Sequence, residues 1–178
     1  MIERISSLHE FNNDLLNSFH VALKATYMKY LDESLSEDMI NDDGYIEVYH
    51  NGYVLSLHGK FGALFVTEIG GSFIPVIVKE TRMKRYSELL NDFITYHKLG
   101  HFYTHFDELT GEFKPEFEKT HKMIINHQCD LYAVQKMGLE NVIEALTEMI
   151  IITGTDSDES FQLKCRIEML LNKKSILS

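Results

Sequence analysis

Two histidines, His97 and His101, stand four residues apart in a segment whose pattern favours a helix. Side chains at i and i+4 lie on one helical face, so both imidazoles can bind the same metal ion. A catalytic zinc ion takes three protein ligands and leaves one position for water. The pair therefore predicts two ligands of a metal site, or alternatively two core histidines of an amphipathic helix.

Lys98 follows the first histidine directly. When a helix of this type supports hydrolysis, this position carries a glutamate that takes a proton from the metal-bound water. A lysine ammonium has no acceptor, and losing a general base typically costs about two to four decades in rate. Lys98 is either an exposed helical lysine, or a cation that replaces the charge of the metal and holds Asp130 or a partner's carboxylate.

A second segment, residues 126–134, is predicted to lie near the histidines. Asn126 and Asp130 are four residues apart and share one helical face. Asp130 is expected either to accept a hydrogen bond from a histidine, which fixes the tautomer of the imidazole, or to form an ordinary helix salt bridge. Asn126 offers only a neutral amide, which is a poor zinc ligand.

The third ligand can instead come from a histidine near Asn126. His127 is the first candidate, and His121 and His105 are further ones. His127 projects about 100° around the helix from Asn126, so ligation by His127 requires a local rotation. The alternative for all three is a solvated histidine.

The elements that position these residues are predicted from hydrophobic periodicity. Residues 8–31 and everything after about residue 86 favour helices, whereas two hairpins are expected near 45–57 and 63–78. Asn51-Gly52 is a strong turn signal in the first hairpin, and Pro75 suggests an edge strand in the second. The fold class is therefore α+β, with an N-terminal helix, a small antiparallel sheet and a helical bundle.

Helix boundaries in the second half are predicted from capping signals. One helix carries the histidines, a second runs from Pro115 to about Met137 before Gly138, and a third spans 139–152. Asp156 and Glu159 resemble a capping pair that opens a last helix, ending near residue 172. We expect one domain over 1–178, with an N-terminal helix and loop (1–43), a core (44–154) and a C-terminal helix (155–178).

These motifs together resemble the small zincin-type metallopeptidases of the glutamate-ligand (gluzincin) kind, which are short cytoplasmic proteins of bacteria and their phages. That family has His-Glu-Leu-Gly-His on one helix and Glu-x-x-Ala-Asp-x-Tyr-Ala-Val on the next. This chain has His-Lys-Leu-Gly-His at 97–101 and Asn-His-Gln-Cys-Asp-Leu-Tyr-Ala-Val at 126–134, then Gly138. Residues 76–79 resemble the edge strand along which the family's substrates lie.

The resemblance covers about residues 45–153 and implies a role for each matching position. Lys98 falls on the general base, Asn126 falls on the third ligand, and Asp130 falls on the aspartate that orients a ligating histidine. Both losses affect groups that the chemistry requires. We therefore assign no catalytic residue and expect no cofactor, with zinc on His97, His101 and His127 as the alternative.

Composition limits the class of partner. The 178 residues have a net charge of −10, which disfavours direct nucleic-acid binding and suits a protein partner with a basic surface. The two cysteines indicate no disulfide framework, and no apolar run or signal-like segment indicates a membrane, so we expect a cytoplasmic protein. The oligomeric state and the role of the N-terminal helix are left open.

The combined prediction is a catalytically degenerate pseudopeptidase of phage or mobile-element origin. It would act by binding and modulating or inhibiting a protein, such as a host defence factor. The first alternative is an active zinc peptidase with different ligands. The second is a structural or self-associating domain.

Overall fold

The computed structural model describes residues 2–5, 54–69, 72–79 and 86–177. The chain divides into two compact units, which are described separately here. The first comprises residues 1–83 and 107–112, and the second comprises 84–106 and 113–178. The predicted helix over 8–31 and the Asn51-Gly52 turn lie outside the described residues.

The first unit contains a four-stranded antiparallel sheet. Its strands are β1 (Ile2–Ile5), β2 (Val54–Gly59), β3 (Gly62–Ile69) and β4 (Ser72–Lys79), in the spatial order β1-β2-β3-β4. The predicted hairpin over 63–78 is confirmed as β3 and β4, with Val66 opposite Pro75. Pro75 lies on the edge strand β4, as predicted, because a residue without an amide hydrogen cannot donate to the ladder.

The hairpin predicted over 45–57 is described only in its second arm. Residues 54–57 belong to β2, which pairs with β3 on one side and with β1 on the other. The β1 partner comes from the start of the chain, and the prediction did not include this strand. Residues 45–50 are outside the described part.

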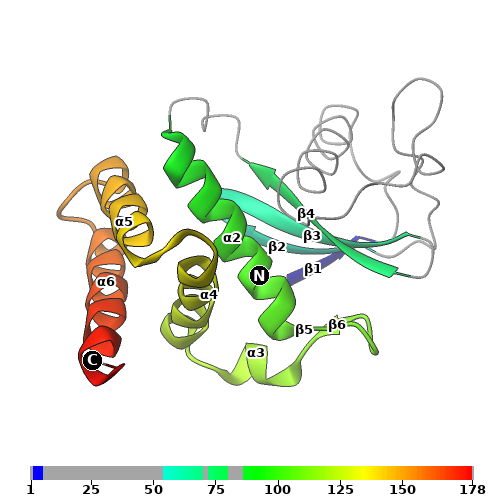
Figure 1. Cartoon of the computed structure of the whole chain (residues 1–178). Coiled ribbons are helices and arrows are strands. Elements are labelled where there is room, and N and C mark those ends of the chain that lie inside the picture. Colours follow the sequence, from blue (N-terminus) through cyan, green and yellow to red (C-terminus); the bar gives the residue numbers. More distant parts are fainter. Residues whose placement is uncertain (1, 6–53, 70–71, 80–85, 178) are drawn as a thin grey trace. The chain divides into compact units, whose positions relative to one another are not determined.

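The second unit is helical and contains the histidines. Its helices are α2 (Glu88–His105), α3 (Pro115–Lys119), α4 (Lys122–Met137), α5 (Leu139–Thr153) and α6 (Asp158–Leu177). Each of α2, α5 and α6 packs against α4 (Figure 1). The α+β class is therefore confirmed. No helix within the described residues has the length and apolar character needed to cross a membrane.

Buried apolar side chains hold the helices of this unit together. Buried apolar side chains come from every long helix of the unit and include Leu90, Phe93, Leu99, Ala133, Val142, Leu146, Leu163 and Leu170. Leu90 and Phe93 in α2 are three residues apart, and Val142 and Leu146 in α5 are four apart, which is the spacing that places side chains on one helical face. At the start of α2, the Ser87 hydroxyl accepts a hydrogen bond from Leu90 N, which caps the helix.

Three predicted helix boundaries are wrong. The last helix ends at Leu177 instead of near residue 172. The helix expected from Pro115 to Met137 is interrupted, because Thr120 and His121 adopt extended backbone conformations between α3 and α4. The His121 ring then caps α4 by accepting a hydrogen bond from Met123 N. The last helix is capped by Ser157, whose hydroxyl accepts from Ser160 N at 3.1 Å, in place of the predicted Asp156.

A short hairpin follows α2. Its strands are β5 (Phe106–Asp107) and β6 (Glu112–Phe113), which pair with each other. Gly111 has a φ of +70°, a left-handed conformation that glycine adopts without steric cost. The sequence indicated only a loop here, because two-residue strands are too short to show periodicity.

Candidate metal and polar site between α2 and α4

The close approach of α2 to α4 depends on Gly100. A Cβ atom at this position would lie 2.9 Å from Cys129 Cα and 3.2 Å from Cys129 Cβ. Only a residue without a side chain allows the two backbones to come this close. The adjacency expected for the two motif segments is confirmed, and it brings the histidine face of α2 against residues 129 and 130 of α4.

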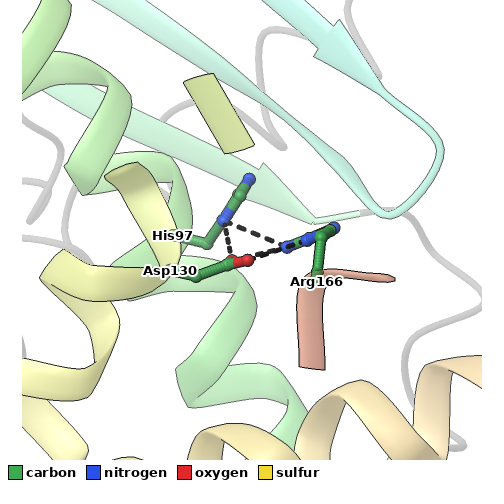
Figure 2. Close-up of polar contacts among 3 residues, drawn as sticks. All are labelled: His97, Asp130 and Arg166. Carbon is green, nitrogen blue, oxygen red and sulfur yellow. Dashed lines mark hydrogen bonds and ion pairs between the residues drawn. The ribbon is translucent and has the colours of Figure 1, made fainter. Parts of the chain in front are cut away.

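Asp130 links three helices through hydrogen bonds (Figure 2). His97 Nδ1 on α2 lies 2.8 Å from Asp130 Oδ1, so the expected contact with a histidine is present. Arg166 on α6 donates from Nε to Oδ2 at 2.8 Å and from Nη2 to Oδ1 at 2.5 Å. Paired bonds from one guanidinium to one carboxylate fix orientation as well as charge. Asp130 thus makes the expected histidine contact, and it also forms an ion pair with Arg166 on another helix, which the sequence did not predict.

This network is largely buried. Asp130 has no exposed surface, and Arg166 is buried as well. Burial alone would raise the pKa of Asp130, but the charge of Arg166 and the hydrogen bonds from His97 and Arg166 outweigh it and lower the pKa. Asp130 is therefore a carboxylate at neutral pH, and both of its oxygens are already occupied.

The carboxylate of Asp130 sets the tautomer of His97. A carboxylate only accepts, so His97 Nδ1 carries the hydrogen and its Nε2 lone pair remains available. Arg166 Nη2 also lies 3.4 Å from His97 Nδ1. Because both nitrogens are then donors, this approach is a contact and not a hydrogen bond. Burial lowers the pKa of His97 despite the opposing effect of Asp130, which favours the neutral imidazole.

His101 lies one turn further along α2 and is buried. Its ring meets the His97 ring edge-on, with centroids 5.0 Å apart, and it also contacts Phe117. Its Nδ1 is a buried atom with no hydrogen-bond partner within the described structure. Burial, followed by the positive charges nearby, holds the pKa of His101 well below its usual value. The imidazole is neutral, so its nitrogens offer a lone pair.

Cys129 completes a group of three potential ligands. One ligand atom from each of His97, His101 and Cys129 lies within 4.8 Å of the other two. Cys129 is a free and fully buried cysteine. Burial and the neighbouring charge of Asp130 raise the pKa of its thiol well above the ordinary value, so the metal-free protein keeps it protonated.

Lys98 is buried within this same region. Its residue is only 8% exposed, so the interpretation as an exposed helical lysine is wrong. Burial lowers the pKa of Lys98 from 10.5 to about 8, with a further decrease from Lys122 and Arg166 and an opposing effect of Cys129. Within the described residues Lys98 forms no ion pair with Asp130, whose oxygens bond to His97 and Arg166.

The other predicted ligands do not join the group of three. His127 and Asn126 are half-buried in α4, and His127 does not belong to the cluster of converging ligand atoms. His121 caps α4 through its ring nitrogen. His105 ends α2, where burial and then the charge of Lys114 lower the pKa of its ring.

Sequence reasoning missed two residues of this site, Cys129 and Arg166. A signal for Cys129 was present, because positions 126, 129 and 130 share one helical face by the i, i+3, i+4 rule. Position 127 points about 100° away from 126 by the same geometry. Arg166 carries no such signal, since its contact with Asp130 joins residues 36 positions apart on different helices.

Comparisons with protein-family models, with curated proteins and with solved structures find no match to this chain. The resemblance to gluzincins therefore stays a prediction that depends on the two motifs.

Proposed function

We propose that this chain is a zincin-like protein that does not hydrolyse peptides and acts by binding another protein. The observation that supports the proposal best is the burial of Lys98 at the position where the resemblance expects a glutamate base. A buried ammonium cannot take a proton from a water molecule. The usual hydrolytic mechanism therefore loses its base without a replacement at the same position.

Asp130 does not supply that base either. Asp130 is the carboxylate bonded to His97, and His97 and Arg166 occupy both of its oxygens. Moving it toward a substrate would break a buried ion pair, which typically costs about 3–5 kcal/mol. Asp130 is thus suited to orient the histidine and unsuited to abstract a proton.

The proposed activity is protein binding, and the charge of the chain suggests the kind of partner. A net charge of −10 favours association with a basic surface and disfavours contact with nucleic acid. Such an inhibitor or modulator of a host protein would need no catalytic residue.

Hydrolysis is tested with a pool of fluorogenic peptides, supplied zinc and a chelator control. We expect no chelator-sensitive cleavage by the wild-type chain. The double variant Lys98→Glu with Asn126→Glu should gain zinc-dependent cleavage, because both lost groups are restored. The matched control is Lys98→Gln with Asn126→Gln, which has the same shapes without the charges. Zinc-dependent cleavage by the wild type, abolished in His101→Ala, would contradict the proposal.

Partner binding needs its own experiment. A tagged chain expressed in a bacterial host is purified at low and at high salt, and its oligomeric state is measured by light scattering. We expect a basic protein to copurify at a fixed ratio and to dissociate as salt is raised, because screening weakens the attraction. A chain that is recovered alone, as a fixed oligomer, would support a structural or self-associating domain instead.

A second candidate function is an active zinc peptidase with different ligands. The convergence of His97, His101 and Cys129 favours it, since three ligands with an open fourth position are typical of catalytic zinc. Lys98, with a pKa of about 8, would have to act as the base in its neutral form. The cleavage assay above separates the two candidates, with Lys98→Met as the variant that would abolish activity only in the second.

A further inference from the structure

We propose that His97, His101 and Cys129 form a zinc site, in which the thiolate of Cys129 takes the ligand position that Asn126 cannot fill. This inference goes beyond the proposed function, which requires no metal. It rests on the positions of three side chains from two helices, together with two features of their surroundings.

The three potential ligands are of the types that zinc prefers. Two imidazoles and one thiolate are ligands that zinc prefers, and the same combination of nitrogen and sulfur disfavours magnesium and calcium. In a tetrahedral site with ordinary Zn–N and Zn–S bonds, ligand atoms stand about 3.5 Å apart. The three ligand atoms lie within 4.8 Å of one another, so closure requires a movement of about 1 Å.

The His97 ring is oriented as in a metal-binding histidine. A zinc-binding histidine usually donates its other ring hydrogen to a carboxylate or carbonyl. His97 does this through Nδ1 to Asp130, which leaves Nε2 for the metal. Arg166 holds Asp130 in turn with two bonds (Figure 2). Such a chain of contacts is more than a helix salt bridge requires, because it fixes the direction of the ring.

His101 has a ring nitrogen that is buried without a hydrogen-bond partner in the described structure. This side chain is 5% exposed, and its Nδ1 has no hydrogen-bond partner within the described residues. Leaving a buried polar atom unpaired typically costs about 1–3 kcal/mol. A metal ion bound through Nδ1 would take the place of the missing partner and remove this cost.

One neighbouring group opposes the metal. The Lys98 ammonium lies in the same buried region and repels a cation. The thiolate reduces this repulsion, because the Cys129 proton is released to the buffer when the Zn–S bond forms. The charge of the ligand therefore compensates for the charge of the neighbouring lysine, which a neutral amide at position 126 could not do.

The test uses cobalt(II) as a spectroscopic substitute for zinc in the full-length chain. The chain has only two cysteines, so Cys165→Ser leaves Cys129 as the single thiol. Cobalt added to the metal-free Cys165→Ser chain should produce the ultraviolet charge-transfer band of a cobalt–thiolate bond. It should also produce the strong visible bands of tetrahedral cobalt, and one equivalent of zinc should remove both.

The variants identify the ligands. Cys129→Ser should lose the charge-transfer band and weaken zinc binding on the order of 100-fold or more, because even the loss of an orienting residue costs about 10–100-fold. Asp130→Asn should weaken binding by about 10–100-fold without removing the band. His127→Ala should leave both unchanged. Circular dichroism of each variant establishes that it is folded.

Absence of the thiolate band in the Cys165→Ser chain would overturn the proposal, and this result does not depend on whether Cys129→Ser folds. Loss of zinc in His127→Ala but not in Cys129→Ser would also overturn it and identify His127 as the third ligand. Zinc binding without peptide cleavage agrees with both proposals. If the chain binds zinc and cleaves peptides, only the proposed function is contradicted. If it does neither, only the proposed zinc site is contradicted.

Discussion

Replacing Lys98 by methionine is expected to stabilise the metal-free protein at neutral pH. Burial is the main reason why the pKa of Lys98 falls from 10.5 to about 8. Each pKa unit corresponds to 1.36 kcal/mol, so keeping the ammonium in this site costs about 3 kcal/mol of folding free energy below pH 8. Methionine has a similar length and no charge, so Lys98→Met should recover most of this cost.

The pH dependence provides a sharper measurement. Between pH 8 and 10.5 the unfolded chain still binds the Lys98 proton, whereas the folded protein has lost it. The free energy of unfolding of the wild type therefore rises through this window, and the variant lacks this contribution. In urea unfolding with chelator present, the difference between Lys98→Met and wild type should fall from about 3 kcal/mol at neutral pH toward zero above the window.

The control for this experiment is Lys119→Met, at the exposed end of α3. A surface substitution of this kind typically changes stability by less than about 0.5 kcal/mol. Two results would refute the reasoning. One is a Lys98→Met protein that is less stable than wild type at neutral pH. The other is a difference between the two that stays constant as the pH rises.

Three further substitutions test the packing and polar contacts around α2. Gly100→Ala should cost about 1–3 kcal/mol in urea unfolding, because its Cβ would meet Cys129, and a gain in stability would mean that the helices are further apart. Arg166→Met should cost about 3–5 kcal/mol of unfolding free energy, because Asp130 stays buried without its cationic partner. Adding Asp130→Asn should recover part of this loss. Additive losses in the double-mutant cycle would contradict the coupling between Arg166 and Asp130. Ser87→Ala should destabilise the protein by about 1–2 kcal/mol and so lower its thermal midpoint, since the Ser87 hydroxyl caps α2 and donates a hydrogen bond to Glu148; an unchanged midpoint would mean that the cap is not needed.

The helices that carry the site could be predicted because their signals are local. The histidine ladder of α2 repeats every four residues, and Gly138 ends α4 with a φ of +87° that other residues rarely adopt. The interruption between α3 and α4 gave no comparable signal. It falls at Thr120 and His121, with no proline or glycine, and the backbone conformations there come from the tertiary structure.

The composition of the site was predicted only in part, for the same reason. His97 and Asp130 belong to recognisable motifs, so their contact could be predicted from the sequence. Cys129 occupies a position where the motif has alanine, so the motif alone does not identify it as a ligand. Arg166 belongs to no motif, and only the packing of α6 against α4 brings its guanidinium to Asp130.

The contribution of α6 has a consequence for the order in which the protein is made. Ribosomes synthesise the histidine segment well before residue 166, and domains generally fold as units during synthesis. Until Arg166 has emerged, Asp130 lacks its cationic partner and cannot hold the His97 ring in the buried arrangement seen here. The His97 ring is therefore held in this orientation only after α6 has been synthesised and has packed against α4.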